Sequence, residues 1–333
     1  MMKIAINGFG RIGRPVFKIA MDHPEVEVVA INDLTDLDNL AYLLKYDTVY
    51  GVYEHDVEVK NENLLVSGKE VKCFKEKDPK NLPWEDLGVD LVIESTGIFK
   101  DKETAGAHLE AGAGKVLISA PTKDKDIKTI VCGVNEDELT EEDKIISNAS
   151  CTTNCIAPIM KVLDQVFGVE KSLMSTIHSY TSTQSIVDGP SGKDLRRGRA
   201  AAYNVVPTST GAAKAAALTM PQLDNVFDGM AYRVPTLAGS VSDIVAVLKK
   251  DATEEEINQA FQEAESGELK DVLKTSQEPL VSHDILGSHY SAIVQTDLTK
   301  VIGGNLVKVV GWYDNEWGYS ARMIDLALKM FAK

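Results

Sequence analysis

Cysteine and long apolar runs are both scarce in this chain of 333 residues. Its cysteines are too sparse for a disulfide framework, so we expect free thiols in a reducing compartment: Cys73, Cys132, Cys151 and Cys155. No apolar run reaches about 18 residues, the length that a membrane-spanning helix needs. The amino terminus also lacks the apolar core and the cleavage site of a secretory signal. We therefore expect a cytoplasmic protein without a membrane segment.

Positive charge is also in short supply. The chain has 35 lysines and arginines against 50 aspartates and glutamates, a formal net charge of -15. Such a balance argues against binding to nucleic acid or to an anionic membrane through charge alone. Small molecules and other subunits are the expected partners. We find no internal repeat and no low-complexity tract.

The length and the 44% hydrophobic content predict two domains, and the first has the pattern of a parallel α/β sheet. Strand-like runs alternate with helical segments up to residue 150. The expected strands are 3–7, 25–33, 89–96, 115–119, 129–133 and 144–150, and the expected helices begin after Gly10 and at 37–46 and 101–112. Residues 49–74 alternate with period two, which predicts an antiparallel hairpin beside this sheet.

Beyond Cys151 the pattern changes to one helix, at 151–168, followed by long strand-like segments with few helices between them. These are 171–181, 226–234, 239–249, 288–297 and 305–313, which predict an α+β domain with a mostly antiparallel sheet. The arginine-bearing stretch 182–204 reads as a functional or interfacial loop. We therefore expect domain 1–150, completed by an amphipathic C-terminal helix at 316–333, and domain 151–315.

A dinucleotide-binding motif begins the first domain. In "KIAINGFGRIGR", Gly8, Gly10 and Gly13 have the spacing that permits a tight turn, a close approach of the backbone to pyrophosphate, and close packing of helix on strand. Asp33 ends the next strand, where a carboxylate accepts both adenosine ribose hydroxyls and repels a 2′-phosphate, which favours NAD over NADP. A helix N-cap is the alternative role for Asp33. Pro15 is expected to kink the helix after Gly10.

The stretch "SNASCTTNCIAP", residues 147–158, places Cys151 where a strand gives way to a helix. The amides at a helix N-terminus favour a thiolate, so we expect a lowered thiol pKa and a nucleophile. Cys155 lies one turn inside the helix and is expected to be buried. A redox switch between the two cysteines remains an alternative, whereas a metal site is disfavoured because no second pair of ligands lies nearby.

A catalytic cysteine needs a base, and the chain has six histidines. His178 lies in "STIHSYTST", a strand-like run of small hydroxyl residues. Composition alone does not separate His178 from His289.

Five motifs in order carry a resemblance that extends over essentially the whole chain: "INGFGRIGR", "ASCTTNCIAP", "GRAAAYNVVPTSTGAAKA", "RVPT" and "WYDNEWGYS". Together they resemble phosphorylating glyceraldehyde-3-phosphate dehydrogenase. The resemblance implies that Cys151 attacks the aldehyde of glyceraldehyde 3-phosphate, while His178 accepts the proton and pairs with the thiolate. It also implies that hydride then passes to NAD and leaves a thioester. Phosphate attacks this thioester and releases the product.

The resemblance also implies binding residues. One anion site consists of Thr181 and Arg233, and the other gathers Ser150, Thr152, Thr210 and Gly211. Thr210 as a helix N-cap and Arg233 as a structural ion pair are the alternatives. The implied cofactor contacts are the backbone of Arg11 and Ile12 on the pyrophosphate, Thr96, Gly97 and Ser119 along the cleft, Asn315 on the nicotinamide carboxamide, and Tyr319 beside it. We assign Phe99 and Trp317 to the core, and we expect no metal.

The chain departs from the family pattern at two places. Lys77 stands where an arginine is common, and lysine does not stack on adenine as a guanidinium does. Residues 237–242, "LAGSVS", replace a different family segment in a region of subunit packing. Loop 182–204 resembles a family loop that reaches a neighbouring subunit, which implies a homotetramer. Alternative functions are erythrose-4-phosphate dehydrogenase and an NAD-binding redox sensor without turnover.

Overall fold

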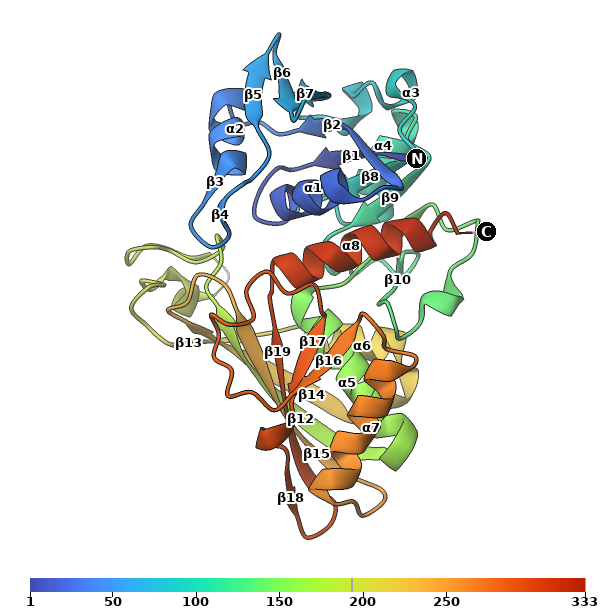
Figure 1. Ribbon diagram of the computed structural model, residues 1–333, viewed down its shortest axis with the longest axis vertical. Coiled ribbons are helices and arrows are strands. Elements are labelled where there is room, and N and C mark those ends of the chain that lie inside the picture. The colour runs from blue at the N-terminus through green and yellow to red at the C-terminus, as the bar shows by residue number, and fades with distance from the viewer. Residues whose placement is uncertain (193, 333) are drawn as a thin grey trace. The chain divides into compact units, whose positions relative to one another are not determined.

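The computed structural model describes residues 1–192 and 194–332. The chain forms two compact units, both drawn in Figure 1. Unit 1 comprises Met1–Ile130, Glu136–Ala149 and Ser320–Lys333, and unit 2 comprises Val131–Asn135 and Ser150–Tyr319.

The sheet of unit 1 has the strand order β10-β11-β9-β8-β1-β2-β7-β6-β5. Its strands are parallel from β10 to β7. Because β1 pairs with β2 on one side and β8 on the other, the order of winding reverses at β1, and a crevice opens at the carboxyl ends of these strands. The bounds are β1 Met2–Asn7, β2 Val26–Asn32, β7 Lys69–Phe74, β8 Leu91–Glu94, β9 Lys115–Ile118, β10 Lys128–Thr129 and β11 Ile145–Ser147. The expected Rossmann-type sheet is confirmed.

The helices of unit 1 are α1 Gly13–Asp22, α2 Leu37–Lys45, α3 Trp84–Leu87 and α4 Lys102–Glu110, with short 3-10 helices η1 Pro79–Asn81 and η2 Glu136–Glu138. Helix α8, Trp317–Lys329, belongs to this unit from Ser320 onward. The expectation that Pro15 kinks its helix is wrong. Helix α1 begins at Gly13, so Pro15 lies in the first turn, where a missing N–H removes no intrahelical hydrogen bond.

The insertion after α2 contains β3 Tyr46–Asp47, β4 Gly51–Val52, β5 Val57–Lys60 and β6 Asn63–Val66. The expected antiparallel hairpin is present, but it continues the main sheet because β7 also pairs in parallel with β2. The expected strand 129–133 reaches no further than Thr129. Its chain then turns, since Val131 donates its N–H to the Asn135 side chain and accepts from the amide of Val134.

Unit 2 contains a sheet of order β13-β14-β12-β15-β19-β17-β16, with β18 paired to β19. Its pairs are antiparallel except for β12 with β14 and β16 with β17, so the mostly antiparallel sheet is confirmed. The bounds are β12 Val169–Ser179, β13 Val206–Ser209, β14 Phe227–Val234, β15 Ser240–Leu248, β16 Leu273–Ser276, β17 Ala292–Gln295, β18 Lys300–Ile302 and β19 Leu306–Tyr313.

One face of this sheet carries helices α5 Cys151–Phe167, α6 Ala212–Thr219 and α7 Glu254–Ser266, as Figure 1 shows. Helix α7 was not predicted from the sequence, although its start has a clear signal. Thr253 and Glu256 form a capping box. The 3-10 helices are η3 Leu195–Gly198, η4 Pro221–Leu223 and η5 Thr296–Leu298. Among the described residues, no helix combines the length and the apolar character that a membrane crossing requires.

The first and third glycines of the dinucleotide motif are held by close backbone packing. A Cβ on Gly13 would lie 2.0 Å from the carbonyl oxygen of Gly8, and a Cβ on Gly8, whose φ is +92°, would lie 2.7 Å from the amide nitrogen of Thr96. Gly10 has no heavy atom within 4 Å of the same position. The backbone of the loop therefore packs tightly at Gly8 and Gly13 and is open at Gly10.

This difference predicts opposite outcomes for two alanine variants. Gly13→Ala is expected to lower the free energy of unfolding by about 2–4 kcal/mol, because the new methyl overlaps the Gly8 carbonyl. Gly10→Ala, as the matched control, is expected to stay within about 1 kcal/mol of the parent. Thermal unfolding followed by calorimetry measures both, and equal midpoints for the two variants would contradict the packing described for Gly13.

Candidate active site

The cysteine singled out in the sequence is the first residue of α5. Ser150 is the N-cap of this helix, and its hydroxyl accepts from the amide of Thr153 at 3.1 Å. The N-cap satisfies one of the amides that a helix start leaves unpaired, and it fixes the first turn of α5. Cys151 is partly buried, and its sulfur lies at the positive end of the helix dipole.

The base is His178, near the end of β12. Its Nε2 lies 3.4 Å from the Cys151 sulfur, and its Nδ1 lies 2.7 Å from the carbonyl oxygen of Ser179 and 3.0 Å from Nη1 of Arg233. The Ser179 carbonyl only accepts, so it favours a proton on Nδ1, and Nε2 is then the acceptor that faces the thiol, whereas the Arg233 donor opposes that proton. His289, the alternative from the sequence, is exposed and stacks on Tyr290 with 4.1 Å between ring centroids.

Burial dominates the electrostatics of this pair. It raises the pKa of the Cys151 thiol, and together with the charge of Arg233 it lowers the pKa of His178. Arg233, the Thr152 hydroxyl and the backbone amides of Thr152 and Cys151 act in the opposite direction on Cys151 and favour the thiolate. The helix start thus acts in the expected direction on the pKa of the thiol, and burial acts against it. Burial likewise opposes the ion pair that the resemblance implies.

Arg233 reaches this pair from the neighbouring strand. The parallel register of β12 and β14 sets it opposite His178, and its Nη1 donates to the Ser179 carbonyl at 2.9 Å. Arg197, from loop 182–204, also lowers the pKa of both His178 and Arg233 by its charge. The sequence predicted a functional or interfacial loop at 182–204 but gave Arg197 no role in the site. Two guanidinium groups therefore favour an anion beside the catalytic pair.

The other residues of the expected anion sites lie at two helix starts. Gly211, and not Thr210, is the N-cap of α6, and the Thr210 hydroxyl accepts from the amide of Ala212, the first residue of the helix, at 3.2 Å. Thr153 links the two helix starts through a 3.5 Å contact with the Ala212 carbonyl. Thr181 lies just beyond β12, and its hydroxyl contacts that of Thr183 at 2.9 Å.

Two further residues support the catalytic pair from β19 and α5. The Tyr313 ring lies edge-on to His178, and its hydroxyl contacts the hydroxyls of Thr152 at 2.9 Å and Thr176 at 2.8 Å. Sequence reasoning missed Tyr313, although strand alternation places it inward on β19. Cys155 is fully buried, and burial raises its thiol pKa, so it has the inert character expected.

Asn315 is held firmly by its side-chain oxygen. That oxygen accepts from the hydroxyls of Ser179 and Ser240, both at 3.0 Å, and from the amide of Gly239 at 3.1 Å. These bonds fix the amide plane and direct its nitrogen away from the three donors. Tyr319 lies buried in the same unit, and burial, with the nearby Cys151 charge, raises its pKa.

Five of the expected cofactor residues of unit 1 line a cavity of about 470 Å³ at the carboxyl ends of the central strands. Gly8, Gly10, Asp33, Lys77 and Thr96 line it. The sequence reading did not assign the remaining lining residues, which are Asn7, Asn32, Leu34, Glu76, Ser95, Ile98 and Phe99. The assignment of Phe99 to the core is wrong, because its ring forms part of the cavity wall.

The expected cofactor residues also make contacts within unit 1. The Asp33 carboxylate accepts from the amide of Phe9 at 2.8 Å and so ties β2 to the glycine loop. The Arg11 side chain pairs with Asp47 at 2.5 Å, and Ile12 is the N-cap of α1. Gly97 has φ +72°, and Ser119 donates its amide to the Glu94 carbonyl at 2.9 Å. Gly13, Arg11, Ile12, Gly97 and Ser119 do not line the cavity.

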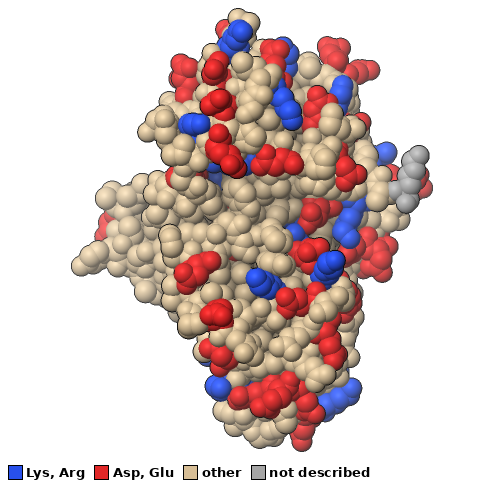
Figure 2. All heavy atoms as spheres, in the orientation of Figure 1, with Lys and Arg blue, Asp and Glu red and all other residues tan. Residues whose placement is uncertain are grey.

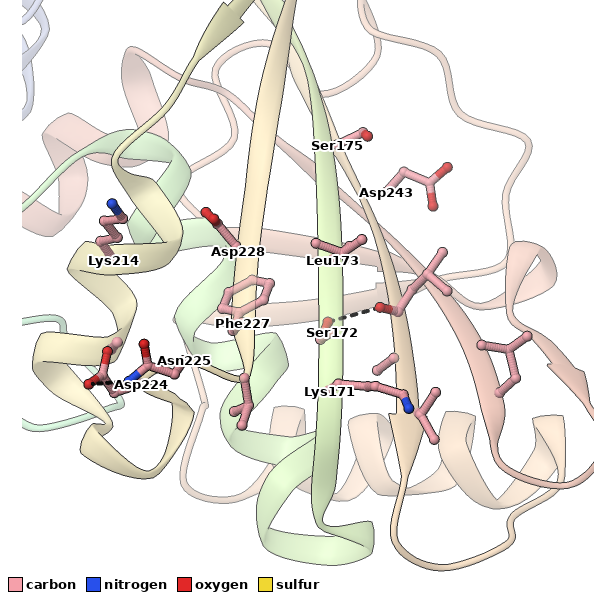
Figure 3. Close-up of a pocket in the computed structure, with 16 residues that line it drawn as sticks. Lys171, Ser172, Leu173, Ser175, Lys214, Asp224, Asn225, Phe227, Asp228 and Asp243 are labelled. Carbon is pink, nitrogen blue, oxygen red and sulfur yellow. Dashed lines mark hydrogen bonds between the residues drawn. The ribbon is translucent and has the colours of Figure 1, made fainter.

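A second hollow, of about 750 Å³, lies on the open face of the unit 2 sheet. Figure 3 shows Leu173, Phe227 and Asp243 beside it on strands β12, β14 and β15. None of the described side chains of the catalytic pair or of its anion sites lines this hollow. It is therefore a surface feature separate from the chemistry. No group of aspartate, glutamate, histidine or cysteine suited to a metal ion occurs within the described ranges.

Comparison with known proteins places this geometry in a family. Family models match residues 2–102, described as the NAD binding domain of glyceraldehyde 3-phosphate dehydrogenase, and residues 150–315, described as its C-terminal domain. The chain belongs to the glyceraldehyde-3-phosphate dehydrogenase family. It is 55% identical over 333 residues to glyceraldehyde-3-phosphate dehydrogenase of Geobacillus stearothermophilus, covering 100% of this chain and 99% of that protein. The corresponding enzyme of Thermotoga maritima is 54% identical over 335 residues, covering 99% of this chain and 100% of that protein.

NAD is the cofactor of this family's first domain, and the residues of unit 1 fit it. Gly10 leaves open space where a pyrophosphate needs to approach the backbone. Asp33 presents a carboxylate at the end of β2, where the adenosine ribose of a dinucleotide lies in such folds.

The departure at 237–242 has a structural consequence within the chain. Gly239 has φ +84°, and a Cβ there would lie 2.3 Å from the Ser282 carbonyl oxygen. A glycine is required because both the conformation and the contact exclude a side chain. Since Gly239 and Ser240 both hold Asn315, this segment bears on the Asn315 side chain as well as on any subunit contact.

The charge of Arg233 leads to a prediction about thiol reactivity. Arg233→Gln is expected to move the midpoint of the pH profile for iodoacetamide alkylation of Cys151 to higher pH, because the lost cation stabilises the thiolate. Stopped-flow alkylation across pH measures the midpoint, and Cys151→Ser identifies the signal. Arg199→Gln, an exposed arginine paired with Asp188, is the matched control and is expected to leave the midpoint in place. A midpoint at lower pH in Arg233→Gln would contradict the assignment.

Proposed function

We propose that this protein is an NAD-dependent, phosphorylating glyceraldehyde-3-phosphate dehydrogenase. It oxidises D-glyceraldehyde 3-phosphate in the presence of inorganic phosphate, forms 1,3-bisphosphoglycerate and reduces NAD, a reaction of glycolysis and gluconeogenesis. One observation carries the proposal: the Cys151 sulfur lies 3.4 Å from the acceptor nitrogen of His178 at a helix start, in a chain that matches enzymes of this name from end to end.

The chemistry begins at the catalytic pair. The Cys151 sulfur attacks the aldehyde carbon, and a carbon–sulfur bond forms as the carbonyl becomes a hydroxyl in a thiohemiacetal. His178 receives the thiol proton at Nε2, because Nδ1 is committed to the Ser179 carbonyl. The protonated imidazole then donates to the developing oxyanion and later removes the hydroxyl proton. The fixed tautomer lets one histidine perform both transfers.

NAD, when bound, supplies the hydride acceptor that turns the thiohemiacetal into a thioester. Phosphate then attacks the thioester carbon, and the Cys151 sulfur leaves as a thiolate, which Arg233, the Thr152 hydroxyl and the α5 amides stabilise. We assign the substrate phosphate to Thr181 and Arg233. We assign inorganic phosphate to Ser150, Thr152, Thr210 and Gly211, because the adjacent starts of α5 and α6 offer amides to an anion.

For the cofactor, we assign the adenosine ribose to Asp33 and the adenine side to Lys77. The glycine loop with Arg11 and Ile12 takes the pyrophosphate, Thr96, Gly97 and Ser119 line the path, and Asn315 with Tyr319 serves the nicotinamide. These roles define the domains that we propose: residues 1–150 with 316–333 bind NAD, and residues 151–315 carry the catalytic groups. The fixed oxygen of Asn315 supports its role, since its free amide nitrogen suits a carboxamide oxygen.

We also infer a cytoplasmic homotetramer. The open face of the unit 2 sheet exposes Leu173 and Val245, which are 67% and 39% exposed in a single chain. In loop 182–204, Ile186 and Leu195 are 81% and 84% exposed. Apolar side chains exposed in such number suit contacts with further copies of the chain. Figure 2 shows acidic side chains spread over the face in view, which suits neither nucleic acid nor an anionic membrane as a partner.

The enzymatic proposal predicts how NADH formation depends on its reactants. With glyceraldehyde 3-phosphate and NAD, steady-state turnover is expected to require phosphate or arsenate, and NADP is expected to be a poor substitute because Asp33 repels its 2′-phosphate. Cys151→Ser is expected to abolish turnover, and His178→Asn to lower kcat by about 10² to 10⁴. Absorbance of NADH at varied phosphate concentration is the measurement.

Two alternatives give different results in the same assay. Erythrose-4-phosphate dehydrogenase would prefer the four-carbon sugar and would turn over without phosphate. A redox sensor would bind NAD and form no acyl phosphate. Either result with the parent protein would overturn the proposal.

The proposed tetramer leads to a prediction about mass in solution. Leu173→Glu is expected to lower the mass below that of four chains, because it places a charge in the apolar contact on the sheet face. Leu298→Glu changes a leucine of η5 that is 43% exposed and is expected to leave the mass unchanged. Light scattering after size exclusion distinguishes them, and a parent protein with the mass of one chain would contradict the inferred assembly.

A further inference from the structure

A carboxylate that the mechanism does not use lies at the centre of unit 1. Glu94 is the last residue of β8, and it is 1% exposed. One of its oxygens accepts from the Asn7 side chain at 2.5 Å, and His108 Nε2 lies 3.2 Å from the same oxygen. The other oxygen accepts from the Thr96 amide at 2.8 Å and from the Thr96 hydroxyl. A buried charge surrounded by donors in this way binds its neighbours strongly.

The His108 ring is held in one tautomer by Trp84. The indole Nε1 of Trp84 donates to His108 Nδ1 at 3.0 Å, so Nδ1 is the acceptor and Nε2 carries the proton that points at Glu94. Trp84 and His108 are both fully buried. An indole has no second polar atom, and its donor role does not change. In the hydrogen bonds from Trp84 to His108 and from His108 to Glu94, the donor and the acceptor are therefore fixed.

From Glu94 the bonds continue to three parts of the nucleotide cavity. Thr96 and Asn7 both line it. The Asn7 oxygen accepts from the Asn32 side chain at 2.7 Å, and Asn32 pairs with the backbone of Glu76 through bonds of 2.8 and 2.9 Å. Glu76 and Lys77 line the cavity too. Glu94 itself does not line the cavity, yet its hydrogen bonds set the position of side chains on each side of it.

We propose that Glu94 is a positioning residue for NAD, and that Trp84 and His108 orient it. This inference rests on the proposed NAD-dependent function and adds residues to which that function assigns no role. Glu94 acts through Thr96 and Asn7 rather than by touching the cofactor. A glutamine in its place has one acceptor oxygen and one NH₂ donor. The NH₂ group would therefore face two donors, either those of Thr96 or those of Asn7 and His108. His108 cannot compensate by changing tautomer while Trp84 occupies Nδ1.

The test compares three variants of the full-length protein, with NAD affinity measured by titration calorimetry. Glu94→Gln is expected to raise the Kd and KM for NAD about tenfold or more, the size of effect seen when supporting hydrogen bonds behind a binding site are removed. Its kcat at saturating NAD and the alkylation rate of Cys151 are expected to stay within about twofold of the parent, because unit 2 is unchanged. Glu27→Gln, an exposed glutamate on β2, is the matched control and is expected to have no effect.

The third variant, Trp84→Phe, keeps an aromatic ring in the core and removes the indole donor together with part of the buried ring volume. Trp84 does not line the cavity but donates to His108, so loss of this bond is expected to raise the Kd for NAD about threefold, while the Cys151 alkylation rate stays at the parent's value. All affinities are measured well below each variant's unfolding temperature. A folded Glu94→Gln with the parent's Kd overturns the inference.

If Glu94→Gln does not fold, Trp84→Phe decides, and an unchanged Kd in that variant overturns the inference equally. A parent protein that fails to bind NAD would instead overturn the proposed function.

Discussion

The contact between the Cys151 sulfur and His178 Nε2 is the interaction on which the active site depends, and consecutive elements create it. Helix α5 runs away from Cys151 for about 25 Å, Gly168 turns the chain with φ +71°, and β12 returns over about 30 Å to His178. The near match of these two lengths brings the end of the strand back to the start of the helix. Burial then makes the pair sensitive to every charge around it, because there is little water to screen them.

Ser179 links the other parts of the site to this contact. Its carbonyl accepts from His178 and from Arg233, and its hydroxyl donates to Asn315. One residue at the end of β12 thus fixes the tautomer of the base, holds the guanidinium that favours the thiolate, and helps to set the Asn315 amide. Tyr313 secures the opposite side by joining Thr152 of α5 to Thr176 of β12. The site is rigid because neighbouring strands share these few hydrogen bonds.

In unit 1 the packing shapes a cavity, whereas in unit 2 it brings two reactive atoms together. Tight packing at Gly8 and Gly13 defines the loop, and the open space at Gly10 leaves room for a ligand. Below the cavity, the buried Glu94 connects the ends of β8, β1 and β2 through side chains rather than through the sheet's own backbone bonds. Parallel strands make this possible, because their carboxyl ends meet at one edge.

The sequence by itself determined the two fold types, the glycine loop, Asp33 at a strand end and Cys151 at a helix start, because these follow from periodicity and spacing within short segments. Even the missed helix α7 had its signal in Thr253 and Glu256. Only the tertiary structure decided that His178 rather than His289 meets Cys151, that Arg197 and Tyr313 serve the site, that Phe99 lines the cavity and that Gly239 holds Asn315. Each of these contacts depends on strand register or on burial between segments distant in the chain. Patterns within a short segment of sequence specify neither.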